Sequence, residues 1–218
     1  MIGFLGGTGP EGRGLALRMA LAGESVMIGS RDASRAQEAA QRIKDRGPVE
    51  NVFAGTNAET AERCDPVFLT VPYDAQRLLL ESVESLLVGK VVVSTIAPVV
   101  FQEGSIVGFT PPEGSAASQA QTILMNSGVV GAFQTVSASD LWSPGRQLQG
   151  DVVVCSDHQS AKEQVMSLVP KVSALRAIDG GGLGNAHYVE EITALLLNIN
   201  HIYGARASIL ITGLNIEK

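Results

Sequence analysis

The chain has 218 residues, of which 17% are charged and 45% hydrophobic, and its formal net charge is −6. This length can bury a core without disulfides or metals, and the acidic balance argues against a nucleic-acid partner, which needs a basic surface. The two cysteines are too isolated for a disulfide scaffold or a zinc site, and the sequence predicts neither a signal peptide nor a membrane span, so we expect a cytoplasmic protein without a bound metal.

Short apolar runs alternate with helical patterns over the N-terminal half of the chain. The predicted strands of this half cover residues 2–5, 25–28, 51–54, 67–71 and 90–96. Helical spacing at Leu15, Met19 and Ala22 predicts a first helix, and two further predicted helices cover residues 34–44 and 75–87. Strands that are apolar throughout and separated by helices are typical of a parallel sheet with both faces covered. The pattern therefore predicts an α/β fold with a doubly wound (Rossmann) parallel sheet.

The second part of the chain is shorter. Its predicted helices cover 115–125, 161–169 and 185–203, and its predicted strands cover 129–136, 151–155 and 174–178. We interpret Ser160 and Asn185 as the N-caps of the last two helices. A polar loop over 137–150 marks the domain junction. We therefore predict one domain over 1–138 and a small C-terminal α/β domain, ending in the long helix, over 139–218.

A glycine motif follows the first predicted strand and opens the first helix. It reads Gly7-Thr8-Gly9-Pro10-Glu11-Gly12, a G-x-G-x-x-G string. In a dinucleotide site the first glycine permits the tight turn, the second lets the backbone approach a pyrophosphate, and the third lets the helix pack on the strand. The helix N-terminus offers N–H groups and a positive dipole to the phosphates, and Pro10 fits its first turn. We predict a dinucleotide site; the alternative is a glycine-rich turn required only for packing.

The end of the second predicted strand selects the dinucleotide. NAD sites usually carry a carboxylate there to bind the ribose 2′-hydroxyl, but this chain has Ser30 and Arg31. The Ser30 hydroxyl, the Arg31 guanidinium and Arg35, one helical turn further, can bind a 2′-phosphate, and Thr8 lies close enough to contribute. We expect Asp32 to point away. The pattern favours NADP over NAD; the alternative is that the two arginines are solvated surface charges.

Two further strand ends belong to the predicted site. Val71-Pro72 closes the fourth strand, and Ile96-Ala97-Pro98 closes the fifth. Ligands of doubly wound sheets bind at the carboxyl ends of the strands, so we predict that these residues lie beneath the ribose and the nicotinamide. For each proline taken singly, ordinary strand termination is an equal alternative.

The predicted cleft contains no lysine, tyrosine or histidine with a partner that would let it move a proton during reduction of a ketone. The region after residue 136 is also too small for the helical substrate domain that is common in hydroxyacid dehydrogenases. A hydride passed between two stacked heteroaromatic rings requires little acid or base from the protein, and catalysis then consists mainly of positioning. We therefore expect hydride transfer from ring to ring.

Segments along nearly the whole chain match one known family. They are residues 4–16, Gly29-Ser30-Arg31, Cys64-Asp65, and residues 153–155, 166–168, 189–190 and 196–199. With them, the sequence resembles the NADPH-dependent reductases of the deazaflavin coenzyme F420 (F420H2:NADP oxidoreductases). The resemblance implies hydride transfer between NADP(H) and F420 in a homodimer. It also implies that the small C-terminal portion closes a cleft in which the deazaflavin stacks on the nicotinamide.

Carried over by motif, the resemblance implies which residues bind the first coenzyme. NADP would be held by Thr8, Gly9, Pro10, Glu11, Ser30, Arg31 and Arg35, and its nicotinamide end would be lined by Val71, Ala97 and Ala138. On the deazaflavin side the chain departs from the family at three positions. Gln134 stands where the family has histidine, His187 where it has arginine, and Glu191 where it has serine, whereas Thr193 is retained.

Gln134 and Thr193 can still hydrogen-bond the deazaflavin ring, so they are the candidate contacts on that side, and no residue is predicted to act as an acid or base. The departures leave two alternatives open. The chain could be an NADPH-dependent reductase of another acceptor, such as a flavin, a ferric chelate or a small imine. It could also be a non-catalytic NADP(H) redox sensor that passes its state to a partner.

Overall fold

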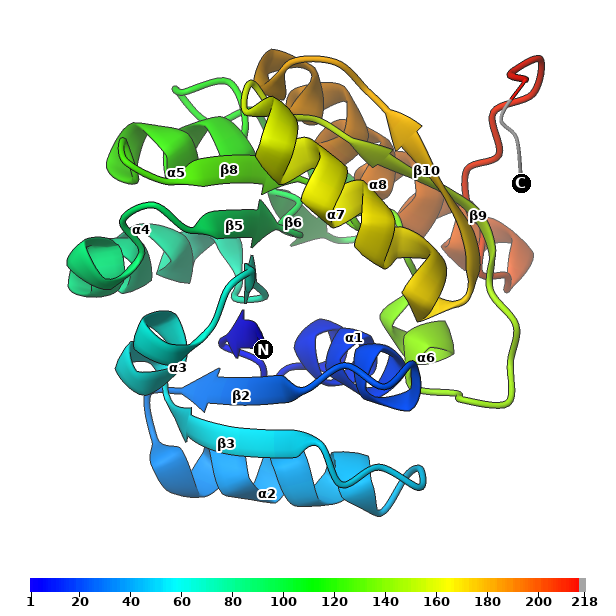
Figure 1. Cartoon of the computed structure of the whole chain (residues 1–218). Coiled ribbons are helices and arrows are strands. Elements are labelled where there is room, and N and C mark those ends of the chain that lie inside the picture. The colour runs from blue at the N-terminus through cyan, green and yellow to red at the C-terminus, as the bar shows by residue number, and fades with distance from the viewer. Residues whose placement is uncertain (216–218) are drawn as a thin grey trace.

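A six-stranded parallel sheet forms the centre of the computed structural model, which describes residues 1–215 (Figure 1). The strands, in the order β3-β2-β1-β4-β5-β8, are β1 (Ile2–Leu5), β2 (Val26–Ser30), β3 (Val52–Thr56), β4 (Val67–Leu69), β5 (Val91–Ser94) and β8 (Gly128–Gly131). The order changes direction between β1 and β4. This confirms the predicted doubly wound sheet and marks the crevice in which such sheets bind ligands.

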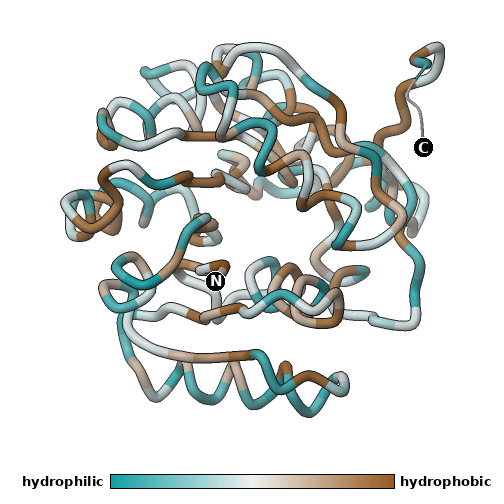
Figure 2. Tube along the Cα trace, viewed as in Figure 1, coloured by the Kyte–Doolittle hydropathy of each residue, from teal (hydrophilic) through white to brown (hydrophobic). Residues whose placement is uncertain are grey.

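Helices cover both faces of this sheet. They are α1 (Pro10–Leu21), α2 (Ala33–Lys44) and α7 (Gln159–Val172) on one face, and α3 (Asn57–Arg63), α4 (Tyr73–Val83, followed by the 3-10 turn η1, Glu84–Leu86) and α5 (Ala116–Ile123) on the other. Successive strand residues point to opposite faces, so Phe4 joins one core and Leu5 the other. This is why the strands are apolar throughout, and Figure 2 shows hydrophobic residues along them and hydrophilic residues along the outer side of α2.

The C-terminal part packs onto the sheet. Its elements are α6 (Ala138–Leu141), β9 (Gln149–Val154), β10 (Ala174–Asp179), the 3-10 turn η2 (Leu183–Asn185) and α8 (Ala186–Tyr203). β9 and β10 form a separate parallel pair, and the bridge between Gly131 and Cys155 joins it to β8. Val165 of α7 and Val130 of β8 belong to one buried cluster, so both parts of the chain share a core.

A hairpin that the sequence did not predict lies against α8. It consists of β6 (Val99–Gln102) and β7 (Ser105–Gly108), which pair antiparallel. Asn198 of α8 accepts a hydrogen bond from the N–H of Ile106 (3.0 Å) and donates one to its carbonyl (2.6 Å). An isolated two-stranded hairpin is at best marginally stable in water, so this one depends on its contact with the helix.

Several predicted boundaries were wrong. The strand expected over 129–136 ends at Gly131, because Phe133 adopts a positive φ of 71° and turns the chain. The loop expected over 137–150 contains α6. Ser160 does not cap α7, which begins at Gln159 with His158 at the N-cap position.

Asn185 does occupy the N-cap position of α8, as predicted. Its side chain does not cap the helix, however, because it donates to the carbonyl of Gly180 (2.8 Å). No helix within residues 1–215 is both long and apolar enough to cross a membrane.

Candidate active site at the carboxyl ends of the strands

The turn between β1 and α1 has no room for side chains at most of its glycines. A Cβ at Gly6, whose φ is +69°, would lie 2.2 Å from Cγ1 of Val71. A Cβ at Gly12 would lie 2.6 Å from Oγ1 of Thr70 and 2.7 Å from Cα of Gly7. Packing of the turn on β4 therefore accounts for the glycines at these positions.

Gly9 differs from the other glycines of the motif. A Cβ at Gly9 would lie 3.9 Å from its nearest neighbours, the carbonyl oxygens of Gly6 and Thr70, so packing does not explain the glycine there. Gly9 is the N-cap of α1, and no side chain caps this end of the helix. Free backbone N–H groups at an open, uncapped helix N-terminus fit the phosphates of a dinucleotide.

A buried asparagine that the sequence analysis missed holds this turn. Oδ1 of Asn57, the first residue of α3, accepts a hydrogen bond from the N–H of Gly6 (3.1 Å). The sequence does contain a signal for α3, because Thr56 and Glu59 form a capping box at its start. Recognising it would have placed Asn57 at the carboxyl end of β3, although not its contact with Gly6.

The end of β2 carries the residues predicted to select NADP. Ser30 is its last residue, and the side chains of Arg31 and Arg35 are exposed. Asp32 caps α2: its Oδ1 accepts hydrogen bonds from the N–H and the hydroxyl of Ser34 (2.8 Å each). These bonds lower the pKa of Asp32, and they direct its carboxylate to the helix, as expected. The two guanidinium groups are thus left available at the edge of the crevice.

The residues predicted beneath the nicotinamide follow the neighbouring strands. Val71 and Pro72 follow β4, and Val71 lies beside the glycine turn; Ala97 follows β5. Ala138 is the first residue of α6, which packs closely on α1, since a Cβ at Gly14 would lie 2.6 Å from Cβ of Leu141. The fold therefore brings the ends of β1, β4 and β5 and the start of α6 to one side of the sheet.

The two candidate deazaflavin contacts lie next to each other. Oγ1 of Thr193 on α8 is 3.2 Å from the carbonyl oxygen of Gln134, and the Gln134 side chain is buried. Nε2 of Gln134 donates to the carbonyl of Ser94 (3.4 Å), whereas its Oε1 is buried without a hydrogen-bond partner. The Gln134 side chain thus keeps a free acceptor near the end of β5.

His187 and Glu191 are each engaged with a neighbour. Nδ1 of His187 donates to the carbonyl of Gly184 (2.6 Å), and its ring lies on that of Tyr188, with 3.7 Å between centroids. Oε1 of Glu191 accepts from the hydroxyl of Thr110 (2.8 Å), which follows the hairpin. This hydrogen bond holds the Glu191 carboxylate toward the segment that follows the hairpin.

A second carboxylate on α8, which the sequence analysis also missed, ties the helix to the Rossmann sheet. Glu190 is 2% exposed and accepts hydrogen bonds from the N–H groups of Ala116 (2.7 Å) and Ala117 (3.1 Å), at the start of α5. Burial raises its pKa to about 7, although the two N–H groups oppose this shift. Burial also raises the pKa of Glu11, in the first turn of α1, to about 8, and its Oε1 has no hydrogen-bond partner.

An apolar pocket of about 460 Å³ lies between α8, the β9–β10 pair and the C-terminal segment. Its walls include Val153, Tyr188, Val189, Ile192 and Ile209. Neither Gln134 nor Thr193 is part of this lining. Among residues 1–215, no cluster of three or more His, Cys, Asp or Glu side chains could hold a metal ion.

Comparisons with known proteins agree with this geometry. Residues 1–98 match the family model described as NADP oxidoreductase, coenzyme F420-dependent. The chain is 43% identical over 205 residues to the F420-dependent NADP reductase of Methanothermobacter marburgensis, covering 91% of this chain and 92% of that relative. It is 36% identical over 222 residues to the F420-dependent NADP reductase of Methanocaldococcus jannaschii, covering 99% of each.

The fold is also that of solved structures. A protein from Arthrobacter sp. FB24, described as a candidate F420-dependent NADP reductase, superposes with a TM-score of 0.83 at 23% identity, covering 97% of this chain and 98% of that one. A pyrroline carboxylate reductase of Plasmodium falciparum with NADP bound gives a TM-score of 0.54 at 15% identity, covering 82% and 57%. The sequence identity to the curated reductases, over nearly their full length, shows that the chain belongs to the family of F420-dependent NADP reductases.

Proposed function

We propose that the chain is an NADP-dependent oxidoreductase that transfers a hydride between NADP(H) and the deazaflavin coenzyme F420. The identity of 36% and 43% to F420-dependent NADP reductases, over nearly the whole chain, carries this proposal. The open cradle at Gly9 and the two exposed arginines after β2 agree with it. When bound, the two coenzymes supply the chemistry, a hydride exchanged between nicotinamide C4 and deazaflavin C5.

The protein's part in this reaction is binding and alignment. The glycine turn and the start of α1 hold the pyrophosphate, and Ser30, Arg31 and Arg35 hold the 2′-phosphate. Val71, Pro72, Ala97 and Ala138 support the nicotinamide. Gln134 and Thr193 offer hydrogen bonds to the deazaflavin. The hydride would pass directly between two carbons, and the proton that the reduced deazaflavin takes up would come from solvent, so no side chain is assigned to move it.

A direct assay tests this function. The purified protein is mixed with NADPH and oxidised F420, and the visible absorbance of the deazaflavin is followed. We expect bleaching at a rate proportional to protein concentration. A folded protein that binds NADPH but leaves F420 oxidised would contradict the proposal. Faster turnover with free flavin or a ferric chelate would then identify a different acceptor, and no turnover with any of them would favour a redox sensor.

The variant Arg31→Ala is expected to raise the KM for NADPH by about 10- to 100-fold, because it removes a charge-assisted hydrogen bond to the 2′-phosphate. The KM for NADH, which lacks that phosphate, should change little. Steady-state kinetics with both cofactors measures the split. Arg42→Ala, in the last turn of α2, removes a charge from the same helix at its far end and serves as the control. An equal rise for both cofactors would show that Arg31 does not read the 2′-phosphate.

Glu11 gives a pH-dependent prediction. Its pKa of about 8 keeps the carboxyl neutral near pH 7, so it does not repel the phosphates that we place at the start of α1. As the pH rises through about 8 the carboxyl ionises, and the affinity for NADP should fall. Titration calorimetry across this range should show the fall in the wild type but not in Glu11→Gln, which is neutral at every pH. Parallel pH profiles for the two proteins would contradict the assignment.

We also propose that the protein acts in the cytoplasm as a homodimer, with residues 139–218 closing the deazaflavin cleft over residues 1–138. Large apolar side chains are exposed on α8 and the hairpin, including Leu195, Ile202, Tyr203 and Phe101, which is more than scattered single residues. Light scattering on the eluting protein should give twice the chain mass of 22.8 kDa. A monomer at micromolar concentration would exclude this assembly.

A further inference from the structure

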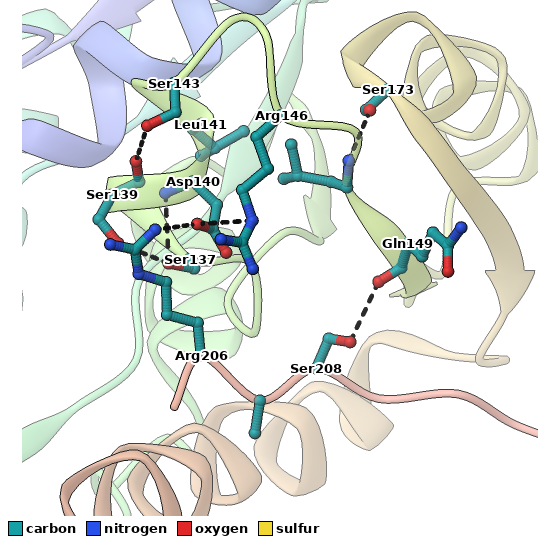
Figure 3. A network of polar contacts seen from close by, with 12 residues as sticks. Ser137, Ser139, Asp140, Leu141, Ser143, Arg146, Gln149, Ser173, Arg206 and Ser208 are labelled. Atoms are coloured by element: carbon teal, nitrogen blue, oxygen red, sulfur yellow. Dashed lines mark hydrogen bonds and ion pairs between the residues drawn. The ribbon is translucent and has the colours of Figure 1, made fainter. Parts of the chain in front are cut away.

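A polar pocket of about 260 Å³ lies beside α6, outside the residues assigned above to either coenzyme. Most of its walls come from three segments that are distant in sequence, residues 135–137, 146–151 and 206–208, and Asp140 and Leu175 complete the lining. Figure 3 shows Arg146 and Arg206 converging on Asp140 at one side of these segments. The first wall segment lies between Gln134 and Ala138, so the pocket adjoins the loop that we place at the site of hydride transfer.

The charges around this pocket do not balance. One oxygen of the Asp140 carboxylate, whose side chain is 9% exposed, forms ion pairs with two arginines. It lies 2.5 Å from Nη1 of Arg206, which also donates a hydrogen bond to it, and 3.2 Å from Nε of Arg146. A third guanidinium, that of Arg18, is buried nearby and donates to the backbone carbonyls of the loop, including those of Asp140 and Arg146. One carboxylate therefore faces three guanidinium groups, which leaves an excess of about two positive charges.

The other carboxylate in the wall does not cancel this excess. Asp151 is paired with Arg176 through two hydrogen bonds of 2.6 and 2.8 Å and also accepts the N–H of Ile211 (2.6 Å). Arg176 lowers the pKa of Asp151, so the pair stays ionised and neutral overall. A local positive excess is notable in a chain whose net charge is −6, and it concentrates anions at this pocket.

Both pocket arginines also have N–H donors that Asp140 does not use. The side chains of Arg146 and Arg206 are 54% and 44% exposed. Arg146 uses its Nε on Asp140, and its two terminal nitrogens make no hydrogen bond to any residue of 1–215; Arg206 uses only Nη1. A guanidinium has five N–H donors in a planar fork that matches phosphate and carboxylate oxygens. Asp140 thus orients the two forks, and their remaining N–H groups are free for a ligand.

We propose that this pocket binds the phosphate or carboxylate groups of the anionic side chain of the deazaflavin co-substrate, with Arg146 as the main contact. The inference rests on the proposed function, because it needs a co-substrate whose ring lies at the neighbouring loop. The phosphates of NADP are assigned above to Gly9 and Arg31, and neither residue lines this pocket. The pocket therefore sets the affinity for the co-substrate without taking part in hydride transfer.

Two co-substrates that share the ring but not the side chain test the proposal. One is F420 with its phosphodiester and glutamyl groups, and the other is the deazariboflavin that lacks them. In Arg146→Gln we expect the KM for F420 to rise about tenfold, the loss of one charge-assisted contact. The KM values for the deazariboflavin and for NADPH should stay within about twofold of the wild type, a change too small to reflect a lost ionic contact. Arg63→Gln, at the end of α3, removes an equal charge far from the pocket and serves as the control.

The outcomes separate the possible failures. An unchanged KM for F420, or an equal rise for both co-substrates, would overturn the pocket assignment, and the same rise in Arg63→Gln would reduce it to net charge. If the wild type reduces neither co-substrate, the proposed function itself fails. F420 stripped of its glutamates identifies the bound group: an Arg146 effect that persists assigns the phosphate, and one that disappears assigns the glutamyl carboxylates. Arg206→Gln is expected to show the same split between the KM values of the two co-substrates. Thermal melts of both arginine variants then check that the effect does not come from unfolding.

Discussion

Gly12→Ala should abolish NADP(H) binding and destabilise the protein at the same time. The new Cβ would lie 2.7 Å from Cα and 3.1 Å from the carbonyl carbon of Gly7, backbone atoms that cannot move aside without displacing the turn. Forcing an extra methyl group into a packed site typically costs about 1–3 kcal/mol. A displacement of about 1 Å in a binding site can cost about 100-fold in activity. Thermal unfolding and NADPH titration measure the two effects separately.

Two other glycines provide matched controls. Gly9→Ala has room for its Cβ, 3.9 Å from the nearest atoms, so its melting temperature should equal that of the wild type while its NADP affinity falls. Gly184→Ala meets no atom within 4 Å and lies away from the motif, so it should change neither quantity. If Gly9→Ala binds NADP as tightly as the wild type, the motif serves packing alone, and the phosphate cradle is wrong.

Glu190→Ala should be the most destabilising change on α8. It would leave the N–H groups of Ala116 and Ala117 buried without partners, at about 1–3 kcal/mol each. It would also free α8 from α5, so the KM for the deazaflavin should rise more than that for NADPH. Glu191→Ala is the matched control, because the carboxylate of Glu191, the next residue on α8, is exposed and makes one hydrogen bond, to Thr110. Equal stability of the two variants would show that Glu190 does not hold the helices together.

The titration of Glu190 predicts how its contribution to stability depends on pH. Its pKa is raised from 4.5 in the unfolded chain to about 7 in the folded protein, so the folded state holds the proton more tightly. The stability that this proton contributes is fully present below about pH 4.5 and is lost as the pH rises through about 7. Glu190→Gln cannot titrate. Urea unfolding should therefore show that the free energy of unfolding of the wild type falls, relative to that of this variant, from pH 5 to pH 8. A constant difference between the two would contradict the assignment.

The half of the site that could be predicted from sequence is the half built from consecutive residues. The glycine turn and the Ser30-Arg31 pair each lie on one strand end, so a strand prediction places them at the crevice. The strands of the central sheet could be predicted because both of their faces are buried, which makes them continuous apolar runs. Their ends were misplaced by a few residues, because a turn such as that at Phe133 depends on backbone angles and not on hydrophobicity.

The other half depends on contacts between distant segments. Asn57 lies 51 residues from Gly6, and Glu190 lies 74 residues from Ala116, so no local pattern links either pair. Glu190 also resembles an ordinary polar position on a helix, because its contact with the first turn of α5 is visible only in the structure. The charged pocket at Asp140 combines three segments for the same reason, and its arginines gave no signal in the sequence.

The contact between Asn198 and the hairpin affects how this protein associates with other chains. By satisfying both the N–H and the carbonyl of Ile106, its amide takes the place of a residue on a neighbouring strand. A free strand edge is a template for pairing with another molecule and a route to aggregation. Here that template is occupied at β7 by a side chain of the same protein. Another chain that associates with the hairpin therefore has to meet it at β6, whose outer edge pairs with no strand among residues 1–215 and where Phe101 stands exposed.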